Sequence, residues 1–204
     1  MQMKALADLD WVEEPLAIDF ANTVRRDGWD YYDLLGTGEA VAEWTRLQRG
    51  RVPAVAAPAA GRRIEEIRAL RDDVFAALKA RALGERDDVG RVPAGAAIER
   101  INAHLRAVPV VLQVAHDDAE ALWVPSRLSR VDNLLARVGA DTAALFLNPA
   151  VELGFCDAPS CGGIFTRERP NQRWCGSACG TRARVARHAD RYRGPGSHSS
   201  ETGR

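Results

Sequence analysis

The sequence has no long apolar run and no secretory leader pattern. No stretch of its 204 residues approaches the roughly 18–20 apolar residues of a membrane-spanning helix. Its N-terminus has neither the apolar segment nor the cleavage pattern of a signal peptide. We therefore expect a cytoplasmic protein without a membrane partner, in a compartment where thiols stay reduced.

Enzyme motifs are absent as well. The sequence contains no Ser/His/Asp pattern, no nucleophile elbow and no phosphate-binding loop, and its four histidines are scattered. We assign no catalytic residue and expect that the protein is not an enzyme. A catalytic function would need a polar pocket around Asp19 and Asn22 that holds a group with a shifted pKa.

Cysteine is scarce, and all four cysteines lie near the C-terminus with the spacing C-x4-C-x13-C-x3-C. Clustered cysteines of a reducing compartment usually bind metal, and this spacing matches no common iron–sulfur pattern. It predicts one structural Zn²⁺ ion, because four thiolates complete a tetrahedral site and leave no position for a catalytic water. Disulfides, an iron–sulfur cluster and free thiols are the alternatives. The predicted ligands are Cys156, Cys161, Cys175 and Cys179.

The residues around the cysteines predict a treble-clef-like finger. Residues 157–160 have a turn composition, and the two glycines at 162 and 163 can bend around a metal. Residues 163–166 and 172–174 are typical of the two strands of a hairpin. The second cysteine pair is four apart and would share a helix face. Phe165 and Trp174 would form a small core, with base stacking as the alternative.

A run of arginines follows the last cysteine. Five arginines lie within 12 positions, and three of them follow a three-then-four spacing that places them on one helix face. Arginine binds phosphate through its forked donors. The segment predicts a nucleic-acid-binding helix, for DNA ahead of RNA. Alternatively, these side chains pair with acidic residues of the same molecule. The predicted contact residues are Arg182, Arg184, Arg187, Arg191 and Arg193.

The chain has no net charge, but its charges are unevenly distributed. Residues 156–193 hold eight arginines and three acidic residues, a balance of +5, whereas residues 1–155 hold 19 basic and 24 acidic residues, a balance of −5. A basic segment on an acidic body favours an anionic partner for that segment. Zinc with four thiolates is formally −2, which lowers the charge of the basic segment to about +3.

The first 150 residues predict a helical domain with one β-hairpin. The hairpin is indicated by β-branched and apolar residues at 110–114 and 122–124. Ser126 would cap the helix that follows, and Gly139 would break or kink it before residues 143–147. Apolar residues at helical spacing predict a short helix over 15–24 and longer helices over 37–47, 62–83, 98–108 and 128–138.

Val41, Trp44 and Leu47 would face the core from the helix over 37–47. Residues 51–61 and 84–95 are typical of loops, and residues 194–204 of a disordered tail. The predicted class is α+β, mainly α. The predicted organisation is a helical domain over 1–150, a four-cysteine finger with a basic helix over 151–193, and a tail over 194–204.

Three polar residues stand in the otherwise apolar segment 15–24, namely Asp19, Asn22 and Thr23. Buried polar side chains must be hydrogen-bonded, so the first interpretation is a structural network. The alternative is a small-ligand pocket lined also by Trp44 and Trp29, in which a small-molecule effector acts on the finger. The protein would then be a protein-interaction or ligand-sensing module, with the finger as a structural staple.

The segment from Trp174 to His188 resembles the CGNR zinc-finger family. The hallmark of this family is a Cys-Gly-Asn-Arg tetrad at the second cysteine pair, followed by a basic helix. Here the tetrad is Cys179-Gly180-Thr181-Arg182. Thr181 replaces the amide of the family Asn by a hydroxyl, which changes a hydrogen-bonding group and leaves the metal ligands in place.

The upstream region resembles the ABATE domain that accompanies CGNR fingers. Pro15 to Thr23 is similar to its N-terminal motif of apolar residues with an Asp and an Asn-Thr pair, and Asp33-Leu34-Leu35 and Trp44 have a similar placement. The resemblance therefore covers most of the chain. It implies a helical domain followed by a zinc finger, and a stress-related transcription regulator or an RNA-binding protein.

Overall fold

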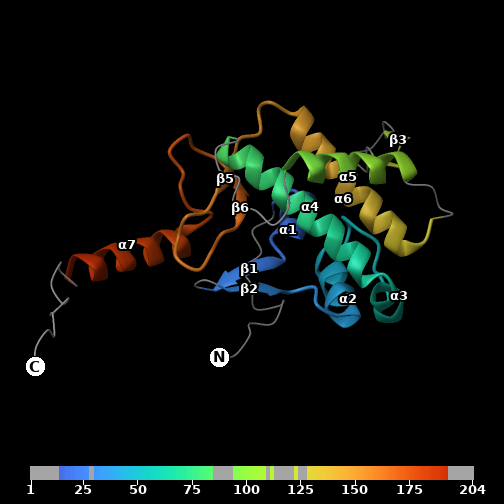
Figure 1. The fold of residues 1–204 in the computed structure, drawn as a ribbon, viewed down its shortest axis with the longest axis horizontal. Coiled ribbons are helices and arrows are strands. Elements are labelled where there is room, and N and C mark those ends of the chain that lie inside the picture. The colour runs from blue at the N-terminus through green and yellow to red at the C-terminus, as the bar shows by residue number, and fades with distance from the viewer. Residues whose placement is uncertain are drawn as a thin grey trace, which may run out of the picture.

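The computed structural model describes residues 14–27, 30–84, 94–108, 111–112, 122–123 and 128–192. Within these residues the chain is mainly helical, with three two-stranded antiparallel sheets, which confirms the predicted fold class. Figure 1 shows a helical body at one end, the last helix projecting from the other end, and a short hairpin between them. No helix of the described ranges combines the length and the apolar character needed to cross a membrane.

The elements follow one another along the chain with short connections. The body contains α1 (Leu16–Ala21), β1 (Val24–Asp27), β2 (Asp30–Asp33), α2 (Gly38–Leu47), α3 (Ala57–Arg62), α4 (Ile64–Leu83), α5 (Ala94–Ala107), β3 (Val111–Leu112), β4 (Leu122–Trp123) and α6 (Arg130–Leu147). The C-terminal part contains β5 (Leu153–Phe155), β6 (Ile164–Thr166) and α7 (Ser177–Tyr192). Each odd-numbered strand pairs with the even-numbered strand that follows it.

Several predicted helices are confirmed with shifted bounds. α4 occupies the predicted segment and buries Ile67, Val74 and Leu78, whereas α5 begins at Ala94, four residues earlier than predicted. In the short N-terminal segment, α1 ends at Ala21, and Val24 begins β1. The predicted hairpin at 110–124 is confirmed for its described residues, because β3 pairs with β4.

α2 lies where the sequence predicts it, because the Thr37 side chain accepts a hydrogen bond from the Ala40 amide at 3.2 Å and so caps the helix. Val41 and Trp44 are buried as predicted. The predicted burial of Leu47 is wrong, since its side chain is 45% exposed. Gln48, seven residues after Val41, occupies the next buried position on that helix face.

α6 differs from the prediction at its start and in its middle. It begins at Arg130, and Ser129 rather than Ser126 caps it by accepting a hydrogen bond from the Asp132 amide at 3.1 Å. The predicted break at Gly139 is also wrong, because α6 continues to Leu147. A Cβ atom at Gly139 would lie 3.0 Å from Leu105 Cδ2, so this glycine allows α5 to approach α6 closely.

Two parts of the body were not expected. α3 replaces the second half of the predicted loop 51–61 and extends to Arg62, with Pro58 in its first turn, where a missing amide hydrogen costs nothing. β1 and β2 form a hairpin that has no counterpart in the predictions. Trp29, Ser126, Arg193, most of the predicted loop 84–95 and the predicted tail lie outside the described residues.

One apolar core joins the body to the hairpin β5–β6. α1 is buried and contacts both α4 and α6. Leu153 of β5 and Ile164 of β6 belong to the same core, whereas Phe165 belongs to a second, smaller core around the cysteines. Successive residues of a strand point to opposite faces. The hairpin therefore turns one face to the body and the other to the cysteines.

Candidate metal centre and nucleic-acid interface

The four cysteines form a cluster that could hold a metal ion. Their sulfur atoms all lie within 4.8 Å of one another, with separations of 3.7 Å between Cys161 and Cys175 and 3.4 Å between Cys175 and Cys179. A tetrahedral ion with metal–sulfur bonds of about 2.3 Å needs sulfur–sulfur distances of about 3.8 Å. A disulfide would need about 2.0 Å, and all four cysteines are free. The sulfur cluster thus fits a tetrahedral ion such as zinc.

The electrostatics of the cluster also favour a cation. Hydrogen bonds from the neighbouring thiols of Cys156 and Cys175 lower the pKa of Cys161, and the hydrogen bond to Cys161 raises the pKa of Cys156. The first thiolate therefore makes further ionisation of its neighbours unfavourable. A divalent ion removes this conflict, because its charge stabilises all four thiolates at once.

A tight knuckle presents the first two ligands. The Cys156 amide donates to the Gly163 carbonyl at 2.8 Å, and the Cys161 amide donates to the Ala158 carbonyl at 3.1 Å. Ser160 and Gly162 have φ angles of 59° and 66°. The predicted bending at Gly162 is confirmed, since this left-handed region suits a residue without a side chain.

The hairpin of the finger differs from the prediction. β6 pairs with β5 and not with residues 172–174, which form no strand. The first two cysteines therefore lie in the connection between the paired strands. The second two lie at the helix start, with Cys179 in the first turn of α7 and Cys175 two residues before it. The prediction was wrong because β5 precedes the first cysteine and so lies outside the cysteine motif.

Phe165 and Trp174 form the small finger core, together with the cysteines and Ala183. The Phe165 ring lies across Gly154, where a Cβ atom would be 2.4 Å from Phe165 Cζ. Trp174 lies against the start of α7, where a Cβ atom at Gly180 would be 3.3 Å from the indole ring. The glycine of the Cys-Gly-Thr-Arg tetrad therefore makes room for this tryptophan.

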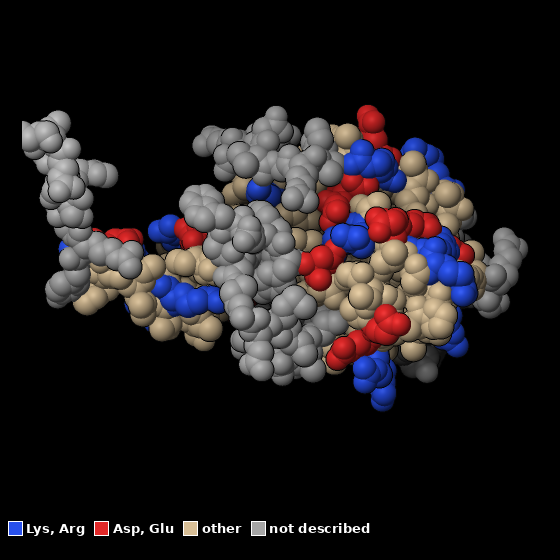
Figure 2. Space-filling view, turned by 60° about the horizontal axis from the view of Figure 1, so that its bottom comes forward, with Lys and Arg blue, Asp and Glu red and all other residues tan. Residues whose placement is uncertain are grey.

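The described arginines of α7 face solvent. Arg182, Arg184, Arg187 and Arg191 are exposed, and none of them forms an ion pair with a carboxylate of the described part of the body. Figure 1 shows α7 pointing away from the body, and Figure 2 shows basic side chains on this projecting end. Asp190 adds one negative charge to the helix. Within the described part of the chain, pairing with the body therefore does not occupy these arginines.

Arg182 and Thr181 have local partners. Arg182 Nη2 donates to the sulfur of Cys179 at 2.8 Å, so this guanidinium compensates a ligand thiolate. Thr181 Oγ1 donates to the Ser177 carbonyl at 3.1 Å and accepts from Arg184 Nη2 at 3.0 Å. The hydroxyl that stands in place of the family Asn thus steadies one exposed arginine and makes no contact with the sulfurs.

The polar residues of α1 are placed in contacts between elements. The Asn22 side chain forms two hydrogen bonds with the backbone of Ile164. Its Nδ2 donates to the Ile164 carbonyl at 2.8 Å, and its Oδ1 accepts from the Ile164 backbone amide at 2.9 Å. The Glu14 carboxylate accepts from the Thr166 amide at 3.1 Å and from the Thr166 hydroxyl at 2.6 Å. The side chains of Asn22 and Glu14 thus provide hydrogen-bond partners for the outer edge of β6 and link the finger to the body. Glu14 was missed, since a glutamate before a proline carries no motif.

Asp19 forms a buried ion pair. Its Oδ2 lies 2.6 Å from Arg51 Nη1 and 3.4 Å from Gln48 Nε2. Burial raises the pKa of Asp19 to about 6, although the hydrogen bond and the charge of Arg51 act in the opposite direction. The Asp19 carboxyl group is thus almost completely shielded from solvent.

The last two residues of the predicted pocket belong to the core. Thr23 Oγ1 donates to the Phe20 carbonyl at 2.7 Å. Trp44 is fully buried, with its ring 5.3 Å from that of Phe20, and its Nε1 finds no partner among the described residues. The four predicted pocket residues thus have separate contacts, and the polar groups of Asp19, Asn22 and Thr23 bond to protein partners.

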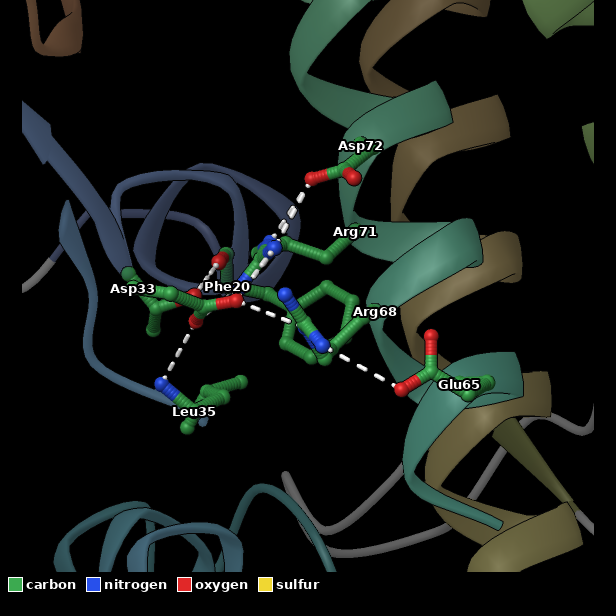
Figure 3. Close-up of polar contacts among 8 residues, drawn as sticks. Phe20, Asp33, Leu35, Glu65, Arg68, Arg71 and Asp72 are labelled. Carbon is green, nitrogen blue, oxygen red and sulfur yellow. Dashed lines mark hydrogen bonds and ion pairs between the residues drawn. The ribbon is translucent and has the colours of Figure 1, made fainter. Parts of the chain in front are cut away.

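Asp33, which begins the predicted Asp-Leu-Leu motif, ties the end of β2 to α4. Its carboxylate pairs with Arg71, and with Arg68 Nε at 2.7 Å, and accepts a hydrogen bond from the Leu35 amide at 2.8 Å. Figure 3 shows both arginines reaching from α4 toward this carboxylate beside Phe20. These contacts lower the pKa of Asp33 despite the opposing effect of burial. The motif residue is therefore structural.

Comparison with known families matches the two parts of the chain separately. The ABATE family, described as "Putative stress-induced transcription regulator", matches residues 14–149, and the CGNR zinc finger matches residues 152–192. No curated protein matched the chain. The family resemblance seen in the sequence motifs is thereby confirmed. Since the first match covers more than half of the residues, the chain belongs to the ABATE family and carries a CGNR zinc finger.

Proposed function

We propose that the protein is a zinc-dependent nucleic-acid-binding regulator, in which α7 contacts phosphate groups of DNA in preference to RNA. One structural zinc ion, held by the four cysteines, would fix the start of α7, and no catalytic step is assigned. The observation that carries the proposal is the solvent-facing arginine row on a helix that projects from the body. The role in transcription rests on the family description alone.

The arginine row has the dimensions of a phosphate contact. Arg184, Arg187 and Arg191 share one face of α7, and a rise of about 1.5 Å per residue spreads them over roughly 10 Å. Duplex DNA offers one phosphate per about 3.4 Å of axis on each strand. Three arginines can therefore meet phosphates of one strand without bending the helix.

The experiment is fluorescence anisotropy of the zinc-loaded full-length protein with labelled duplex DNA and single-stranded RNA over a salt series. For three phosphate contacts on duplex DNA, the logarithm of the association constant should fall with the logarithm of salt with a slope of about −2.7. The variant R184A/R187A/R191A should lose this binding. The variant R46A/R49A/R62A removes the same charge from exposed arginines of the body and should keep it.

Stronger binding of the RNA probe would overturn the preference for DNA. An absence of binding at low salt, with the zinc content verified, would overturn the proposal itself. The finger would then serve as a structural staple in a protein-interaction or ligand-sensing module.

A further inference from the structure

The finger carries a second group of arginines beside α7. The loop 167–173 follows β6 and, with Phe155 and Asp157, borders an open hollow of about 380 Å³. Arg167 and Arg173 line it, together with Pro170, Asn171 and Gln172. Two basic and two amide side chains thus line a concave surface together with one carboxylate, and guanidinium and amide donors are the groups that bind phosphate.

The hollow and the arginine row of α7 each contribute one arginine that lies over the ring of Trp174. The guanidinium carbons of Arg173 and Arg187 lie 5.9 Å and 5.7 Å from the centre of the same ring, that of Trp174. Trp174 is held in the finger core against Gly180. One indole therefore contacts both an arginine of the loop and an arginine of the helix.

The loop is ordered before any ligand binds. Gln172 Oε1 accepts from the Glu168 amide at 2.9 Å, and Gln172 Nε2 donates to the Trp174 carbonyl at 3.3 Å. The Gln172 amide donates to the Arg169 carbonyl at 3.0 Å. A pre-organised loop loses little conformational entropy on binding, so its arginines can contribute most of their interaction energy.

The arginines of the hollow can exchange their present contacts for a phosphate. Arg167 is exposed and forms no ion pair within the described ranges. Arg173 pairs with Asp157 at 2.5 Å, but the two side chains are 65% and 48% exposed. Ion pairs as exposed to solvent as this one contribute little to stability, so a phosphate can replace the carboxylate.

We propose that the hollow of loop 167–173 binds a further phosphate group of the same nucleic acid, with Arg167 and Arg173 as donors. The finger then holds the phosphate backbone at two places, which are linked through Trp174. This inference rests on the proposed function, because it assumes that α7 binds nucleic acid. Asp157 acts as an internal competitor that occupies Arg173 in the free protein.

The salt dependence distinguishes one contact surface from two. Three arginines of α7 predict a slope of about −2.7 on duplex DNA, whereas two additional contacts predict about −4.5. The variant R167A/R173A should return the slope from about −4.5 to about −2.7 and weaken binding to probes of any sequence. The control R46A/R49A removes two charges from exposed arginines of α2 and the following turn, and should change neither quantity.

D157N provides an independent test, because removal of the competing carboxylate releases Arg173. It should tighten binding at low salt by a few-fold, whereas a purely structural role of the hollow predicts no gain. Zinc content and circular dichroism verify that each variant is folded. The inference is overturned if R167A/R173A binds like its control or if D157N brings no gain, while the loss of binding in R184A/R187A/R191A still supports the proposed function.

Discussion

Asp19 shows how one residue can link folding to pH. Its carboxylate is 3% exposed and relies on Arg51 and Gln48 for its polar contacts. Burial raises its pKa from 3.8 to about 6, so the folded protein binds this proton more tightly than the unfolded chain. Between about pH 4 and pH 6 the folded state therefore holds more protons, and stability falls as the pH rises through this window.

The variant D19N should remove this contribution. A shift of about two pKa units corresponds to about 3 kcal/mol. As the pH rises from 4 to 7, the free energy of unfolding of D19N relative to that of the wild type should therefore increase by up to that amount. Urea denaturation of both proteins at several pH values measures the difference. The other carboxyl groups with raised pKa values are present in both proteins, so a difference that stays constant with pH would contradict the assignment to Asp19.

At the scale of elements, the decisive contact is that of β6 with the segment around α1. β6 is an edge strand, and the Asn22 amide and the Glu14 carboxylate supply the hydrogen bonds that a third strand would provide. Ile164 also enters the body core. The finger is therefore joined to the body by polar and apolar contacts of one short strand.

N22A should destabilise this junction. It removes two hydrogen bonds and leaves the buried amide and carbonyl of Ile164 without partners, which costs about 2–4 kcal/mol in total. Chemical denaturation followed by tryptophan fluorescence measures the loss. N171A, at an exposed position of loop 167–173, serves as the control and should change stability by less than about 0.5 kcal/mol. Equal stabilities of the two variants would refute a fastening role of Asn22.

Local patterns predicted the elements that local physics determines. The apolar period of α4 and the spacing of the four cysteines are visible within one turn or one motif. The pairing of β5 with β6 was missed because β5 is only three residues long, and its partner lies across the metal knuckle. The role of Asn22 depends on a contact 142 residues away, which no periodicity encodes.

The candidate site divides in the same way. Metal ligands follow from spacing, and the exposed face of α7 follows from the three-then-four arrangement of its arginines. The contact of Arg182 with the Cys179 sulfur follows from the fold, which brings its guanidinium back over the first turn of α7. From the sequence alone, Arg182 was predicted to contact phosphate, because a count of arginines does not distinguish one that faces a thiolate.

At the scale of the whole molecule, the two cores have different origins of stability. The body has a large apolar core shared by six helices and β5–β6, whereas the finger core consists of a few residues around the cysteines. A unit with so small a core depends on its metal, and zinc binding in small fingers contributes on the order of 10 kcal/mol. We therefore expect the orientation of α7 to depend on a bound ion, and the fold of the body to be independent of it.

Removal of the metal should therefore separate the two parts. Treatment with a strong chelator should release one zinc ion per chain, unfold the 16 residues of α7 and leave the helices of the body intact. Circular dichroism would show a partial loss of helix, and a thermal transition of the body would remain, because its core and its caps contain no metal ligand.

Nucleic-acid binding should disappear in parallel, since the arginine row exists only while α7 is helical. Readdition of zinc should restore both signals together, and C179S should resemble the chelated protein. Binding that survives chelation with α7 still helical would show that the finger core suffices without an ion, and that the four sulfurs hold no structural zinc.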